Sequence, residues 1–148
     1  MNMYDTTQWQ TCGAQWPPDL AQITTYLRRD DVVQALHAEA GAALHEWEHC
    51  SDRVGAQMWT PNSAPSVKLL PGLLEKIPVL LYAGDRDAMC PGVGIEAMIG
   101  KLEWNGATGF NGSEKQEWTV EGREAGTWTT DRGLTYVEVF GASHSKPV

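Results

Sequence analysis

The stretch that decides the fold runs Ile77-Pro78-Val79-Leu80-Leu81-Tyr82-Ala83-Gly84-Asp85-Arg86-Asp87-Ala88-Met89-Cys90. Its apolar run lies between Pro78 and Gly84, which predicts a short buried β-strand. Two aspartates and a cysteine follow the end of that strand. In open α/β sheets, ligands and catalytic groups gather outside the carboxyl ends of strands, so Asp85, Asp87 and Cys90 are the first candidate site residues.

Helices and further strands are predicted after and before this strand. Ser66–Lys76 has helical apolar spacing, interrupted or kinked at Pro71-Gly72, and Val93–Leu102 is another apolar helix candidate. Residues 66–102 therefore read helix, strand, helix. Segments rich in β-branched and aromatic residues predict antiparallel strands at one side of the sheet, with a turn at 131–133: Trp118–Glu121, Thr127–Thr130 and Leu134–Phe140.

The first part of the chain is predicted to be helical. Leu20–Arg29 and Asp30–Ala38 each begin next to an aspartate that can cap a helix, and Gly41–Asp52 stays compatible with a helix. We expect residues 1–65 to form a cap region and residues 66–148 to hold the core strands and helices.

Composition excludes several classes of function. The 148 residues suffice for one domain, and 11 basic against 19 acidic residues give a net charge of −8. A phosphate-binding surface needs the opposite sign, so nucleic acid is not an expected partner. No apolar run approaches the roughly 20 residues of a membrane span, and the first residues show no secretion signal. At least one of the three cysteines must stay unpaired.

One candidate for hydrolytic chemistry is the pentapeptide His45-Glu46-Trp47-Glu48-His49, an H-E-x-x-H pattern. On a helix, this spacing puts two imidazoles one turn apart, where they can share a zinc ion with Glu46 as general base. A catalytic zinc needs a third protein ligand, which the pentapeptide does not identify. The alternative is a polar, solvated helix face.

The second candidate pairs the aspartate after the strand with a histidine in the glycine-led loop at the end of the chain. In α/β-hydrolases the triad follows the order Ser, Asp or Glu, then His, on loops after strands. The carboxylate orients the imidazole, and the imidazole takes the serine proton. Asp87 and His144 suit these two roles, although each alone is also an ordinary loop residue.

Motifs along nearly the whole chain resemble those of serine carboxypeptidases, the family that includes the pheromone-processing carboxypeptidases. Tyr82–Cys90 resembles the family segment Y-A-G-D-x-D-x-x-C, and Trp47 with Cys50 resembles its W-x-x-C. Further similarities follow in family order: Cys12-Gly13 with Trp16-Pro17-Pro18, Tyr26-Leu27-Arg28 with Val32–His37, Leu102-Glu103-Trp104, Trp118, Ala125-Gly126, Leu134–Val139 and Gly141–His144.

The resemblance implies roles for the candidate residues. Asp87 becomes the triad acid, His144 the triad base, and Asp85 a structural residue that binds backbone amides in its own loop. Cys90 matches a free cysteine near the family's active site and is expected to line the substrate pocket. No metal or cofactor is implied, and the substrates would be the carboxyl termini of peptides or proteins.

Other residues fit a protein of the secretory pathway, in the Golgi, the vacuole or outside the cell. Cys12 and Cys50 match cysteines that form disulfides in the family, with the partner of Cys50 far toward the amino terminus. Asn111-Gly112-Ser113 is an N-glycosylation sequon. These roles come from the resemblance and the tripeptide pattern.

No serine of the chain lies in a G-x-S-x-G nucleophile elbow, and the family's W-N-G-G-P-G and E-S-Y-A-G segments are also missing. We therefore expect a carboxyl-terminal portion of a serine carboxypeptidase: a partial α/β-hydrolase fold with an exposed sheet edge and apolar face, inactive by itself. The alternatives are a non-catalytic remnant and a chain that complements a separate serine-bearing half. Ser145 also departs from the family, which has methionine after the histidine.

Overall fold

The structure, a computed structural model, describes residues 2–7, 20–58 and 64–145. The chain divides into two compact units, one made of residues 1–14 and 64–148 and the other of residues 15–63. None of the helices in the described ranges combines the length and the apolar character that a membrane crossing needs.

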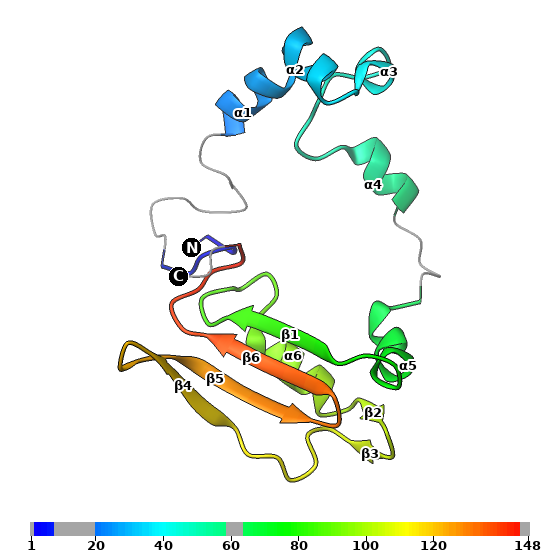
Figure 1. Ribbon diagram of the computed structural model, residues 1–148. Helices are drawn as coiled ribbons and strands as arrows, with labels where there is room; N and C mark the ends of the chain where they lie inside the picture. Colours follow the sequence, from blue (N-terminus) through cyan, green and yellow to red (C-terminus); the bar gives the residue numbers. More distant parts are fainter. Residues whose placement is uncertain (1, 8–19, 59–63, 146–148) are drawn as a thin grey trace. The chain divides into compact units, whose positions relative to one another are not determined.

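The unit of residues 15–63 is helical, as Figure 1 shows for α1 to α4. Its helices are α1 (Leu20–Leu27), α2 (Asp30–Ala35), α3 (Glu39–Ala42) and α4 (Asp52–Met58). The first two confirm the predicted helices. The helix predicted over Gly41–Asp52 is wrong, because residues 43–51 are not helical. Here the carbonyl of Trp47 accepts a hydrogen bond from the Arg28 side chain (2.9 Å) rather than from a helical amide.

The other unit is a mixed sheet with helices packed on it (Figure 1). The strand order is β1-β6-β5-β4, with β1 parallel to β6 and the other pairs antiparallel. The elements are a 3-10 turn (Ser66–Leu69), α5 (Leu70–Leu74), β1 (Val79–Gly84), α6 (Gly92–Ile99), β2 (Glu103–Trp104), β3 (Ala107–Thr108), β4 (Gln116–Val120), β5 (Arg123–Asp131) and β6 (Leu134–Val139).

Most of these elements confirm the predictions for 66–140, with two corrections. Pro71 lies in the first turn of α5, where its missing N–H costs nothing. The proline does not break the helical region, which changes from a 3-10 turn to an α-helix just before it. Strand β1 is not buried throughout, because Leu80 is 60% and Tyr82 69% exposed. They occupy alternate positions on the face of β1 opposite the core.

The hydrophobic core lies on one face of the sheet. Its buried members come from α5, β1, α6, β2 and β6: Leu74, Ala83, Ile99, Trp104, Leu134 and Tyr136. The opposite face is also apolar, since Tyr82 pairs in register with Val137, which pairs in turn with Trp128. Strands that are apolar on both faces are typical of sheets covered on both sides.

Three two-residue turns join the antiparallel strands. Asn105-Gly106, Glu121-Gly122 and Arg132-Gly133 each have positive φ at both positions, as tight hairpins of this twist require. The predicted turn at 131–133 is confirmed. The small β2–β3 hairpin was not predicted, although Asn-Gly is its usual sequence signal.

Gly84, the last residue of β1, allows the terminal loop to approach the strand. A Cβ atom there would lie 2.3 Å from the carbonyl oxygen of Ala142 and 3.0 Å from that of Ser143. Both atoms belong to the backbone and cannot rotate away. Only glycine therefore lets the 141–143 backbone pass this close to the end of β1.

Gly84→Ala should lower the free energy of unfolding of the chain by about 1–3 kcal/mol, because the added methyl must push backbone away. Gly72→Ala in α5 is the matched control, since a Cβ there meets nothing within 4 Å. It should be neutral or stabilise by about 0.5–1 kcal/mol. Urea denaturation of both variants measures the difference, and equal stabilities would contradict the steric account.

Candidate active site

The candidate site lies where β1 and β6 end. The two strands are parallel neighbours with Gly84 opposite Val139, so their following loops leave the sheet at the same edge (Figure 1). One loop carries Asp87 and the other carries His144. The Nδ1 atom of His144 lies 2.8 Å from Oδ2 of Asp87, a hydrogen bond between residues 57 apart in the sequence. The structure thus brings together the two residues predicted as acid and base.

The Asp87 carboxylate is held by its own loop. Its Oδ1 atom accepts hydrogen bonds from the backbone amides of Met89 (2.8 Å) and Cys90 (3.0 Å), which leaves Oδ2 for the imidazole. The residue is buried. Burial alone would raise the pKa of this carboxyl, but the hydrogen bonds from Cys90, His144 and Met89 outweigh it and hold the pKa below its ordinary value.

Asp85 joins the two loops instead of facing the imidazole. Its Oδ1 atom accepts a hydrogen bond from the amide of Gly141 (2.8 Å), and its own amide donates to the carbonyl of Val139 (3.1 Å). The amide of Arg86 donates to the carbonyl of Ala142 (3.0 Å). Asp85 therefore binds a backbone amide of the loop that carries His144, and not an amide of its own loop.

Residues 2–7 contact both loops, which the sequence did not predict. The carbonyl of Tyr4 accepts a hydrogen bond from the His144 amide (2.9 Å), and the ring centroids of the two residues lie 5.3 Å apart. The carbonyl of Met3 accepts from the Ala88 amide (3.0 Å). This early segment thus fixes the backbone of both loops.

Comparisons with known proteins show the family of this chain. The family described as serine carboxypeptidase matches residues 1–148. The chain belongs to the serine carboxypeptidase family. A pheromone-processing carboxypeptidase of Pyrenophora tritici-repentis is 49% identical over 99% of the chain. The corresponding protein of Podospora anserina is 44% identical over 99%.

A solved structure shows the same fold. The crystal structure of a prohormone-processing carboxypeptidase from Saccharomyces cerevisiae matches 99% of this chain with a TM-score of 0.79 and 32% sequence identity. The chain therefore has a partial α/β-hydrolase fold, as the resemblance implied. It spans 24% and 26% of the lengths of the two curated relatives and 32% of the crystallised yeast chain.

In this serine carboxypeptidase chain, Cys90 lies next to the acid and base. Its thiol, a carboxylate oxygen of Asp87 and a ring nitrogen of His144 all lie within 4.8 Å of one another. Cys90 is exposed and free. Its position is compatible with the predicted lining of a pocket beside the imidazole.

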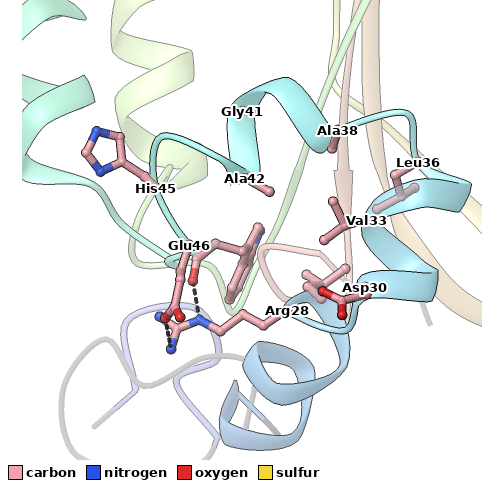
Figure 2. Close-up of a pocket in the computed structure, with 11 residues that line it drawn as sticks. Arg28, Asp30, Val33, Leu36, Ala38, Gly41, Ala42, His45 and Glu46 are labelled. Carbon is pink, nitrogen blue, oxygen red and sulfur yellow. Dashed lines mark hydrogen bonds and ion pairs between the residues drawn. The ribbon is translucent and has the colours of Figure 1, made fainter.

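The H-E-x-x-H pentapeptide lacks the helix on which its zinc chemistry depended. Residues 45–49 lie between α3 and α4 in non-helical backbone. Glu46 forms an ion pair with Arg28 (2.9 Å), as Figure 2 shows. His45 contacts the side chain of Arg53. The residues that could group around a metal in the described part of the chain are Asp87, Cys90 and His144.

Figure 2 shows a hollow beside this ion pair, within the helical unit. It has a volume of about 460 Å³ and is lined by apolar residues of α2 and α3, such as Val33 and Ala42, together with Arg28 and Glu46. Because Arg28 is already paired with Glu46 and with the carbonyl of Trp47, its charge is compensated inside the hollow.

The remaining predicted residues are two cysteines and an asparagine. Cys50 is exposed and free in the structure, and Cys12 lies outside the described residues. Asn111 is exposed, as a glycan acceptor must be, and its backbone N–H donates a hydrogen bond to the Asp131 carboxylate (3.2 Å). The disulfide and glycosylation roles stay predictions.

The lowered pKa of Asp87 predicts how stability depends on pH. The ionised carboxylate stabilises the fold above the ordinary aspartate pKa of about 3.9, and this contribution is lost as the pH falls through the lower pKa of the folded state. Asp87→Asn should therefore lower the urea midpoint at neutral pH, and the difference from the natural chain should shrink below about pH 4.

Glu117→Gln, which removes an exposed carboxylate from β4, is the control and should leave the profile unchanged. A difference between Asp87→Asn and the natural chain that stays constant down to about pH 2 would contradict the assignment.

Proposed function

We propose that this chain supplies the acid and the base of a serine carboxypeptidase active site, Asp87 and His144, to a nucleophilic serine that its own 148 residues do not present in a G-x-S-x-G elbow. The observation that carries the proposal is the 2.8 Å hydrogen bond between a buried carboxylate and an imidazole at the ends of two parallel strands. The chain alone is inactive, because an acid and a base without a nucleophile form no acyl-enzyme.

The hydrogen bond between Asp87 and His144 determines which ring nitrogen can act as the base. Asp87 accepts the Nδ1–H of His144, so the Nε2 atom of the ring is the one available to take the serine proton. The serine oxygen then attacks the carbonyl carbon of the last peptide bond of the substrate. The imidazolium gives its proton to the departing amine, and water hydrolyses the acyl-enzyme with His144 again as base.

The surface of β1 supports a role within a larger sheet. Leu80 and Tyr82 project from the face opposite the core, and β1 is the edge strand of the sheet that the described residues form. An apolar edge of this kind is usually paired or covered in a stable protein. A serine-bearing part of the fold, covalently joined or separate, would supply that cover.

The substrates we propose are peptides that end in a basic residue. The net charge of −8 favours the approach of cationic peptide ends. The relatives are named pheromone-processing and prohormone-processing carboxypeptidases. We place this protein in the secretory pathway accordingly.

A chimaera tests the proposal directly. The aligned segment of the Pyrenophora tritici-repentis relative is replaced by this chain, and release of the terminal residue from a peptide ending in lysine or arginine is measured. The chimaera should be active and the chain alone inactive. Asp87→Asn and His144→Ala in the chimaera should each lower kcat by about 10⁴-fold.

The matched control is His49→Ala, which should leave activity unchanged. Loss of activity in His49→Ala would instead favour zinc chemistry at the pentapeptide. Release of terminal residues by the chain alone, or activity that survives His144→Ala, would contradict the proposal. A folded but inactive chimaera would favour the non-catalytic remnant.

A further inference from the structure

An early segment of the chain, residues 2–7, binds the loop of the candidate acid on both sides of the aspartate. The Met3 carbonyl accepts a hydrogen bond from the Ala88 amide (3.0 Å), and the Thr6 amide donates to the Arg86 carbonyl (3.0 Å). We call this segment the strap. It fixes the backbone immediately before and immediately after the acid.

The strap binds the other loop at the candidate base itself. The carbonyl of Tyr4 accepts a hydrogen bond from the His144 amide (2.9 Å), and the centroids of the two rings lie 5.3 Å apart. Because the adjacent carbonyls of Met3 and Tyr4 bind different loops, the strap sets the separation between the loops. The 2.8 Å hydrogen bond from His144 to the Asp87 carboxylate depends on that separation.

Asn2 holds the strap in its conformation. The residue is 1% exposed, and its Oδ1 atom accepts a hydrogen bond from the Tyr4 amide (2.9 Å), two residues along the chain. Asparagine and aspartate favour turns of this kind, because the side-chain oxygen replaces a backbone acceptor. A buried polar side chain lowers stability unless it is hydrogen-bonded, so an asparagine at this position supplies the turn and not apolar packing.

We infer that Asn2 is a positioning residue for the Asp87–His144 pair. Its side chain holds the Tyr4 amide, and this contact directs the carbonyls of Met3 and Tyr4 to the two loops. Without the side-chain acceptor, the strap can rotate and the two loops can move apart. The effect on catalysis rests on the proposed function; the effect on the loops does not.

Hydrogen exchange of backbone amides in the intact chain, followed by NMR, tests the inference without any activity. Asn2→Leu keeps the size of the side chain and removes the acceptor. The His144 and Ala88 amides should exchange about 10-fold faster in this variant, because they donate to the strap. The Val79 amide, which donates to the Gly133 carbonyl (2.9 Å) at the other end of β1, should keep its rate.

Asn2→Asp keeps the oxygen acceptor and should restore the natural exchange rates. Thr7→Ala is the matched control, since it removes a side-chain hydrogen bond of the strap that ends at Asp5 (2.6 Å) and not at a loop. It should leave the rates unchanged. If Asn2→Leu does not fold, Asn2→Ser gives the same test. Its hydroxyl makes this turn more weakly, so the His144 and Ala88 amides should again exchange faster.

The chimaera extends the test to catalysis. Asn2→Leu should lower kcat by about 10–100-fold with KM nearly unchanged, because a displaced base slows the chemical step more than it weakens substrate binding. Asn2→Asp should recover kcat, and Thr7→Ala should leave it unchanged.

Three results would overturn the positioning role: unchanged exchange of the His144 and Ala88 amides in Asn2→Leu, equal acceleration of the Val79 amide, and no recovery in Asn2→Asp. The two proposals fail separately. A chimaera that is inactive with the natural Asn2 removes the proposed function, whereas loop exchange that depends on Asn2 still supports the positioning role. An active chimaera that Asn2→Leu leaves unimpaired removes the positioning role alone.

Discussion

Strands β1 and β6 pair in parallel, and this pairing brings the two halves of the candidate site together. A parallel pair ends at one edge of the sheet, so the loops after Gly84 and Val139 start side by side although their residues are far apart in sequence. The hydrogen bonds of Asp85 to Gly141 and of Arg86 to Ala142 then join the loops. The geometry of Asp87 and His144 follows from this pairing.

The close approach of the two loops depends on small residues and on one early segment. Gly84 has no Cβ, and the carbonyl of Ala142 occupies the space where one would be. Met3 and Tyr4 accept hydrogen bonds from the Ala88 and His144 amides. The imidazole is thus held from its backbone, from its ring neighbour and from its carboxylate partner, which limits the rotamers it can adopt.

The face of the sheet opposite the core carries exposed apolar side chains. Leu80 and Tyr82 are mostly exposed, and they belong to an edge strand. Burial of such side chains contributes about 1.5–3 kcal/mol each, so a partner surface here would stabilise the chain considerably. This exposed face agrees with the proposal that a further part of the fold contacts the sheet.

Local patterns predicted much of the fold and both residues of the Asp87–His144 pair. The strand at 79–84, the antiparallel strands and the turn at 131–133 follow from alternation and turn chemistry, and the order of Asp87 and His144 follows from motif similarity. Contacts between distant segments could not be predicted in this way. Residues 2–7 carry no local signal for packing on loops about 80 or more residues away. The 45–49 pentapeptide matches a helical motif, but Arg28 binds its backbone at Trp47.

The hydrogen bond between Asp87 and His144 is the centre of the account, and the tautomer of His144 tests it most directly. Nitrogen-15 NMR of the histidine-labelled chain at neutral pH distinguishes the two ring nitrogens. The account predicts a proton on Nδ1 that is donated to Asp87, and loss of that signal in Asp87→Asn. A neutral ring protonated at Nε2, with Nδ1 bare and unchanged in Asp87→Asn, would contradict it.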